Sequence, residues 1–212
     1  MSTLRLHWRP GTAAMAPHAA LAEIGVEYDL ARVELNADGE APAAYLRLNP
    51  SGLVPTLETG ELVLTESAAI LLHLADAYPE ARLMPPLQTV ERSDAYRWLL
   101  HLTNTLQNTL LRLHFPERYG ESGVRTSAAA AADRELAAIE RHLDGRHWLV
   151  GQTRGAPDLF LFMLTRWGRI LAPPAWERPG IRSHFLRALA LPGVRRMMDE
   201  QGLDLPPFAT HP

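Results

Sequence analysis

The chain has 212 residues, 47% of them hydrophobic, which is enough to bury a full core as one large domain or two small ones. A formal net charge of −3 and the lack of any basic run argue against a nucleic-acid partner. With no cysteine, the protein can form neither a disulfide framework nor a thiolate metal site, and it has no thiol nucleophile of its own. We find no leader-like segment and no run near the roughly 18 apolar residues of a membrane helix, so we expect a soluble, cytoplasmic protein with no membrane partner.

The first 80 residues alternate between strand and helix signals, which is typical of an α/β unit. Period-two alternation predicts strands at 4–8 and 28–35 and a hairpin of 56–58 with 62–64. Helical spacing predicts helices at 16–24, 43–48 and 66–77. The order β-α-β-α-β-β-α is that of a thioredoxin-like domain.

The rest of the chain contains only helical signals. Helices are predicted at 90–113, 125–143, 156–171, 181–189 and 193–200, followed by an irregular tail at 203–212. Residues 81–89 contain two prolines and little periodicity, as a linker does. The predicted fold class is therefore α/β plus all-α, with a thioredoxin-like domain at 1–80, a linker at 81–89 and an all-helical domain at 90–212.

One short segment carries a family signature. The run from Asn49 to Leu57 contains Val54-Pro55, and Glu66-Ser67 opens the next predicted helix. With the helical second half, this segment resembles the glutathione S-transferase family over nearly the whole chain. Within it, residues 4–35 and the run 147–152 are most similar to the bacterial beta class.

The resemblance implies a binding site for glutathione, a tripeptide with an extended backbone, two carboxylates, an ammonium and a thiol. In this family the proline at the position of Pro55 is cis, and Val54 pairs with the cysteinyl backbone as an added strand would. The plain alternative is that Pro55 only starts a strand. Glu66 and Ser67 would hold the γ-glutamyl ammonium and carboxylate at a helix N-terminus. Alternatively, they only cap that helix.

Other positions depart from the beta-class pattern. Asp38 stands where that class has a lysine for the glycine carboxylate, which leaves Arg32 or Arg47 as substitutes. On the long helix, Leu100 and Gln107 stand where the class presents an asparagine and a histidine to the neighbouring subunit. Gln107 can still bind glutathione across a dimer, or it can be a solvated residue.

The thiol activator is the main departure. The family uses a tyrosine on the first strand, or a serine or cysteine at the start of the first helix, but those positions here hold Trp8, Ala13 and Ala14. The one hydroxyl left nearby is Thr12, which we assign as the candidate catalytic residue. A threonine at a loop-to-helix junction is otherwise a helix cap.

The resemblance also implies an apolar pocket for the second substrate. Its candidate residues are Trp8, His101, Asn104 and Trp167, and Trp167 can instead be plain core. The nine histidines show no metal-ligand spacing, so no metal is expected.

We therefore expect a homodimeric glutathione transferase that conjugates glutathione to an apolar electrophile in detoxification, or uses it in peroxide or disulfide chemistry. Two alternatives stay open: a non-catalytic protein of the same fold that binds glutathione or an apolar ligand, and a regulatory protein of this fold that binds another protein through its surface and does not bind glutathione.

Overall fold

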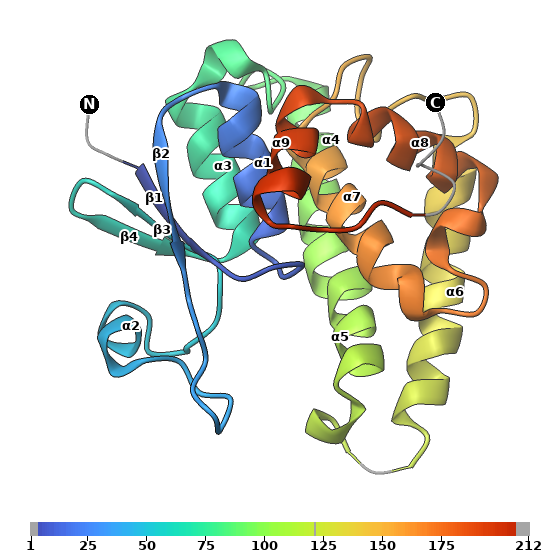
Figure 1. The fold of residues 1–212 in the computed structure, drawn as a ribbon. Coiled ribbons are helices and arrows are strands. Elements are labelled where there is room, and N and C mark those ends of the chain that lie inside the picture. The colour runs from blue at the N-terminus through green and yellow to red at the C-terminus, as the bar shows by residue number, and fades with distance from the viewer. Residues whose placement is uncertain (1–3, 121, 207–212) are drawn as a thin grey trace. The chain divides into compact units, whose positions relative to one another are not determined.

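The structure, a computed structural model, describes residues 4–120 and 122–206, which form two compact units (Figure 1). Unit 1 consists of Met1–Ala81 together with Leu191–Pro212, and unit 2 is Arg82–Ala190. The domain limits 1–80, 81–89 and 90–212 stay predictions. As a packing unit, however, the segment after residue 190 belongs with the first 81 residues.

Unit 1 is built on a four-stranded sheet. Its strands are β1 (Leu4–Trp8), β2 (Tyr28–Arg32), β3 (Thr56–Thr59) and β4 (Leu62–Thr65), in the order β2-β1-β3-β4. β1 is parallel to β2 and antiparallel to β3, and β3 is antiparallel to β4. In this register Leu6 lies between Leu30 and Leu57, and both Leu6 and Leu57 are fully buried, as a strand with one face on the core requires.

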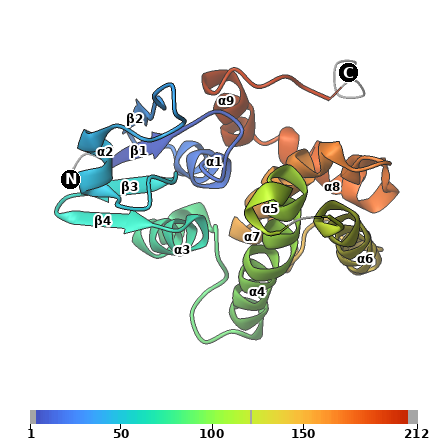
Figure 2. The ribbon, with the colours of Figure 1, turned by 90° about the horizontal axis from the view of Figure 1, so that it is seen from below.

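The helices of unit 1 include one from the C-terminal segment. They are α1 (Met15–Ile24), α2 (Ala43–Leu48), α3 (Ser67–Ala77), the 3₁₀ turn η1 (Pro79–Ala81) and α9 (Pro192–Glu200). α1 and α3 cover the same face of the sheet, and α2 lies apart from them (Figures 1 and 2). This arrangement is the thioredoxin-like fold that the element order predicted.

Gly25 fixes the C-terminal end of α1, and Gly193 lets α9 pack closely against this helix. Gly25 has a φ of 78° and ends α1 in the left-handed region, where glycine is favoured. At Gly193 a Cβ atom would lie 2.5 Å from the backbone nitrogen of Glu23, so only glycine permits this close approach. The Gly193 N–H also donates to the Glu23 carboxylate at 2.6 Å.

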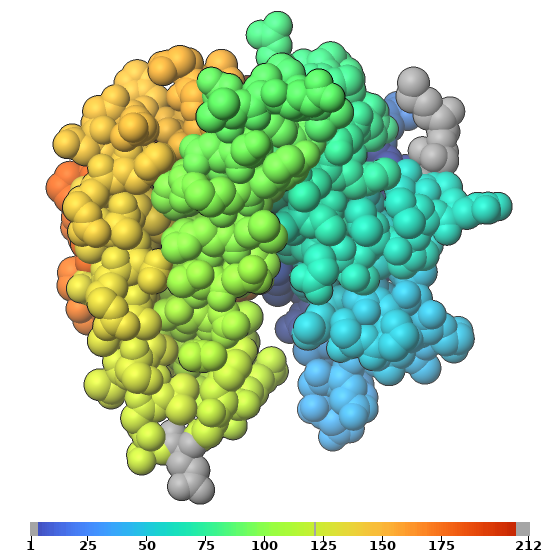
Figure 3. Space-filling view, turned by 180° about the vertical axis from the view of Figure 1, so that it is seen from behind, coloured from blue at the N-terminus to red at the C-terminus, as the bar shows by residue number. Residues whose placement is uncertain are grey.

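Unit 2 contains the remaining helices. They are α4 (Val90–His101), the π-helical segment η2 (Leu102–Gln107), α5 (Asn108–His114), η3 (Pro116–Arg118), α6 (Val124–Leu143), α7 (Ala156–Trp167), η4 (Gly168–Ile170), η5 (Ala175–Glu177) and α8 (Pro179–Leu189). The surfaces of α5 and α6 lie side by side, green and yellow in Figure 3. α7 is buried along almost its whole length and forms the centre of this core.

The beginning of α7 is fixed by one buried carboxylate. Asp158 accepts hydrogen bonds from the N–H groups of Leu149 and Gly155, each at 2.8 Å, and from the His184 ring at 2.9 Å. Asp158 and His184 are both buried. Asp158 is the third residue of α7, and its bond to the Gly155 N–H is the capping-box interaction that fixes the start of this helix.

Two elements end earlier than predicted, and a third contains a different kind of helix. The helix predicted at 90–113 is continuous but contains the π segment η2. The strand predicted at 28–35 ends at Arg32, because its partner β1 ends at Trp8, the residue that pairs with Arg32. The helix predicted at 156–171 ends at Trp167, where Gly168 packs against Ala175 and a 3₁₀ turn begins.

Candidate functional site

Val54 presents an open backbone edge. It lies in the bend before β3, its peptide bond to Pro55 is cis, and its side chain packs against a cluster of Val33, Ala41 and Tyr45. Within residues 4–120 and 122–206, nothing forms a hydrogen bond with the backbone N–H or carbonyl of Val54. An adjacent free donor and acceptor are what an extended peptide needs in order to add as a strand.

The N-terminus of α3 carries the second predicted contact. Glu66 precedes the helix and is exposed. Its φ is 68°, a backbone conformation that residues other than glycine rarely adopt. Ser67 is buried, and its hydroxyl donates to the carbonyl of Ala13 at 2.9 Å instead of capping its own helix. The start of α3 is therefore tied to the loop between β1 and α1, which contains the predicted activator Thr12.

That loop holds Thr12. The Thr12 hydroxyl donates to the Arg9 carbonyl at 2.7 Å and accepts the Ala14 N–H at 3.4 Å, which is the local turn that precedes α1. The Gly11 N–H donates to Oε1 of Gln201 at 3.1 Å, so the segment after α9 also fastens the loop. The Thr12 backbone is fixed by bonds from its N–H to the Arg9 carbonyl and from the Met15 N–H to its own carbonyl, and the residue as a whole is half-buried.

Gln201 connects this loop to a polar network between α1 and α9. Because its Oε1 accepts from Gly11, its Nε2 donates to Nδ1 of His18 at 3.1 Å. Nε2–H of His18 then donates to Glu200 at 2.7 Å, which is the neutral form of the ring. Burial lowers the pKa of His18, despite the opposing effect of Glu200, in agreement with this neutral form.

Glu200 also accepts from Tyr28 at 3.0 Å and from Arg196 at 2.8 Å. Partial burial raises the pKa of its carboxyl, but the hydrogen bonds from Arg196, His18 and Tyr28 outweigh burial and bring the pKa below its usual value. Burial, reinforced by Glu200, raises the pKa of Tyr28. Tyr28 therefore stays a neutral donor, and the network keeps α9 fixed to α1.

The remaining candidates on unit 1 are Trp8 and the basic residues. Trp8 is buried, and its indole nitrogen has no hydrogen-bond partner among the described residues. Arg32 forms an exposed ion pair with Glu34 at 2.7 Å, and Arg47 and Asp38 are both exposed. The anchor of the glycine carboxylate stays a prediction.

Three candidates on unit 2 lie on or next to the π segment. His101 pairs with Glu135 at 3.2 Å, Asn104 is exposed, and the side-chain oxygen of Gln107 is buried without a partner among the described residues. Leu100 is 60% exposed. A π-helical turn changes the direction of the residues that follow it, so α-helical spacing does not describe how these side chains are directed.

Trp167 ends α7 and is 7% exposed. Its carbonyl accepts from His114 at 3.1 Å, and the two rings meet edge to face. Burial lowers the pKa of His114. The roles of Trp8, His101, Asn104 and Trp167 in an electrophile pocket stay predictions.

Among the residues described, no cluster of three or more metal-ligating side chains is found, and no helix is long and apolar enough to cross a bilayer.

Comparison with known proteins identifies the family. Residues 2–76 match the model of the glutathione S-transferase N-terminal domain, and residues 102–192 match that of the C-terminal domain. The glutathione S-transferase GstA of Escherichia coli O157:H7 is 29% identical over 206 residues, with 94% of this chain and 100% of the relative covered. The chain belongs to the glutathione S-transferase family.

Solved structures agree. The bacterial beta-class glutathione S-transferase of Sphingomonas chungbukensis is 29% identical, covers 94% of this chain and 100% of its own, and superposes with a TM-score of 0.83. A sphingomonad glutathione S-transferase complexed with glutathione is 27% identical, with 94% of this chain and 100% of that chain covered and a TM-score of 0.84. The resemblance to the bacterial beta class is confirmed.

Proposed function

We propose that this protein is a glutathione transferase, which binds glutathione on unit 1 and transfers its sulfur to a small apolar electrophile. The observation that carries the proposal is the free backbone edge of Val54, in a chain of this family. Glutathione is the co-substrate, and the protein provides orientation and proximity.

Each contact uses a chemical property of the peptide. The backbone of Val54 pairs with the cysteinyl residue, next to the cis Pro55. The N-terminus of α3 and Ser67 receive the γ-glutamyl carboxylate, and Glu66 receives the ammonium. Gln107 adds a contact from a neighbouring subunit. Trp8, His101, Asn104 and Trp167 belong to the pocket for the electrophile.

Activation of the thiol is the demanding step. A cysteinyl thiol has a pKa of about 8.5, and lowering that pKa by two units takes roughly 2.7 kcal/mol. A hydrogen bond to a charged group contributes about 1.5 to 3 kcal/mol, and a helix terminus only about 0.3 to 1 kcal/mol. Because Ala13 and Ala14 offer no side-chain donor, Thr12 is the nearby hydroxyl for this task. It reaches the sulfur by rotating away from the Arg9 carbonyl.

The test of this proposal is a calorimetric titration with glutathione, combined with the ultraviolet absorbance of the thiolate as a function of pH. We expect binding with a lowered thiol pKa.

Thr12→Val removes the hydroxyl and should reduce turnover at about pH 6.5 by roughly five- to thirty-fold. The hydrogen bond from Thr12 stabilises the thiolate, but part of that stabilisation is offset because the hydroxyl gives up its bond to the Arg9 carbonyl. Thr126→Val, on the exposed face of α6, is the matched control. Unchanged turnover in Thr12→Val would remove Thr12 from the mechanism.

The same titration distinguishes the alternatives. Glutathione binding without a shift of the thiol pKa, and turnover at the uncatalysed rate, would indicate the non-catalytic binding protein. An absence of binding would overturn the proposed function and leave the fold. The transferases among its relatives favour the catalytic function over the binding protein.

The proposal includes a homodimer in the cytoplasm, where reduced glutathione is abundant. α4 and the segment before it carry apolar side chains in solvent: Leu87, Val90 and Leu100 are 66%, 82% and 60% exposed. Isolated apolar residues are common on surfaces, but three in and just before one helix favour a contact with a second copy. Sedimentation at micromolar concentration should give twice the mass of one chain. A monomer at that concentration would contradict the dimer.

A further inference from the structure

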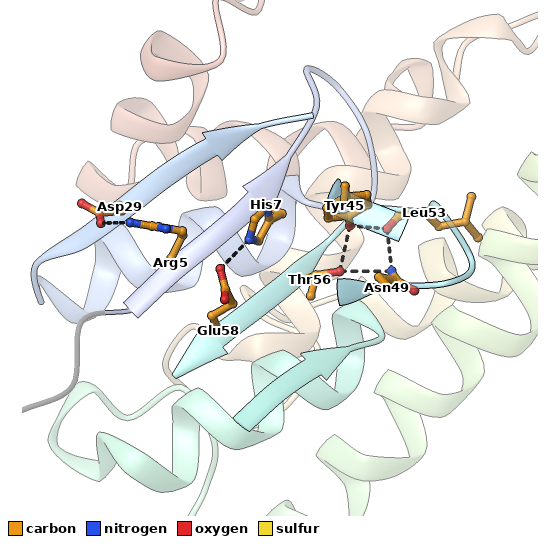
Figure 4. Close-up of polar contacts among 8 residues, drawn as sticks. All are labelled: Arg5, His7, Asp29, Tyr45, Asn49, Leu53, Thr56 and Glu58. Carbon is orange, nitrogen blue, oxygen red and sulfur yellow. Dashed lines mark hydrogen bonds and ion pairs between the residues drawn. The ribbon is translucent and has the colours of Figure 1, made fainter. Parts of the chain in front are cut away.

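The carbonyl that precedes Val54 is held by two side chains. The Leu53 carbonyl accepts from the Tyr45 hydroxyl at 2.6 Å and from Nδ2 of Asn49 at 2.8 Å (Figure 4). Thr56 lies between these two side chains, 2.8 Å from the Tyr45 hydroxyl and 3.1 Å from Asn49. Tyr45, Asn49 and Thr56 are all buried, at 6%, 5% and 0% exposure. Together with the Leu53 carbonyl they form a closed ring of hydrogen bonds, which we call the Leu53 ring.

The chemistry of these groups assigns every proton in the Leu53 ring. The Leu53 carbonyl can only accept, so the single hydroxyl hydrogen of Tyr45 points to it. The Tyr45 oxygen must then accept from Thr56, and Thr56 in turn accepts the second Nδ2 hydrogen of Asn49. No donor is left over. A buried polar ring of this kind is stable in one arrangement only.

The other end of the Asn49 amide fixes the turn before Leu53. Its Oδ1 accepts from the N–H of Ser51 at 3.1 Å and from the Ser51 hydroxyl at 2.8 Å. The Ser51 oxygen accepts the Leu53 N–H at 3.2 Å, and Gly52 adopts a φ of 67°. Because Asn49 both donates and accepts, its amide cannot be reversed. Both polar groups of the Leu53 backbone are therefore bound by side chains, whereas those of Val54 are free.

We propose that Tyr45, Asn49 and Thr56 are positioning residues for glutathione. The Leu53 ring fixes the peptide plane between Leu53 and Val54, and this plane sets the direction of the Val54 N–H. The Val54 side chain packs against the Tyr45 cluster, which limits rotation of the same residue from the other side. This inference rests on the proposed function, because it assigns how the Val54 edge is oriented before the ligand arrives. Orientation in advance lowers the cost of ordering the loop on binding.

The experiment replaces one hydroxyl of the ring at a time. Tyr45→Phe and Thr56→Val each break the ring without adding volume, and we expect each to raise the Kd for glutathione by about five- to twenty-fold, as the loss of one or two hydrogen bonds would. Thr56→Ser restores the hydroxyl and should bind within about two-fold of wild type. Tyr119→Phe is the matched control, since Tyr119 is 43% exposed and lies in unit 2.

Calorimetry separates positioning from a merely structural role. If the ring only stabilises the fold, the variants lose binding-competent protein, so the stoichiometry falls and the Kd of the remaining folded chain does not move. Positioning predicts the reverse, a weaker Kd at wild-type stoichiometry with rescue in Thr56→Ser. Variants that bind as tightly as wild type would overturn this inference and leave the proposed function intact. Wild-type protein that does not bind glutathione would overturn both.

Discussion

Replacing Glu66 with glutamine is expected to weaken glutathione binding by roughly 10- to 150-fold, because the neutral side chain loses a charge-assisted contact worth about 1.5 to 3 kcal/mol with the γ-glutamyl ammonium. Glu66 is exposed at the N-terminus of α3 and has no ion-pair partner among the described residues, so its carboxylate is free for a ligand. Calorimetry with glutathione measures the effect. Glu61→Gln, in the exposed turn between β3 and β4, removes the same charge nearby and should change the Kd by less than about two-fold.

A second substitution at Glu66 separates binding from backbone conformation. The φ of 68° at Glu66 costs a side-chain-bearing residue about 1 to 3 kcal/mol, whereas glycine adopts it freely. Glu66→Gly should therefore unfold at a higher urea concentration than wild type while binding glutathione as weakly as Glu66→Gln. A strained residue that lowers stability and is needed for the ligand is expected at a binding site. Wild-type affinity in Glu66→Gly would refute the assigned role of Glu66.

The fold of the first 81 residues could be predicted because its signals are local. Alternation around Leu6, the left-handed stop at Gly25 and the short hairpin each depend on neighbours a few residues away, and together they give the thioredoxin-like order. Val54 and Glu66 could be named for the same reason, since both belong to short motifs. Their backbone conformations, free at Val54 and strained at Glu66, became visible only in the structure.

The contacts that support the site could not be predicted, because each joins distant parts of the chain. Ser67 bonds to Ala13, 54 positions earlier, and Gln201 bonds to Gly11, 190 positions earlier. Hydrophobic periodicity reports local structure only, so it gives no information about such distant pairs. The π segment was missed for another reason: residues 102–107 have the same apolar spacing as an α-helix, and the different hydrogen-bond pattern is not visible in the spacing. The Leu53 ring had a partial signal in the Asn49–Gly52 turn, but Tyr45 lies outside that motif.

The largest expected loss of stability comes from Asp158. Replacing it with alanine leaves the N–H groups of Leu149 and Gly155 and the Nε2–H of His184 without their acceptor. Leu149 and His184 are buried, so water cannot easily replace the carboxylate. Each unsatisfied buried donor costs about 1 to 3 kcal/mol, and removing one partner of a buried charged network typically costs about 3 to 5 kcal/mol. We expect Asp158→Ala to lower the free energy of unfolding by about 3 to 5 kcal/mol, measured by urea denaturation with tryptophan fluorescence.

Asp158→Asn gives a graded comparison. Its carbonyl oxygen can still accept from Leu149 and His184, but its amide group then opposes the Gly155 N–H, donor against donor, so we expect an intermediate loss of about 1 to 3 kcal/mol. Asp144→Ala removes an exposed aspartate at the end of α6 and should stay within about 0.5 kcal/mol of wild type. If Asp158→Ala were no less stable than Asp144→Ala, the Asp158 network would not be what holds the start of α7. Because α7 is the centre of the core of unit 2, that result would also mean that this core forms without its polar anchor.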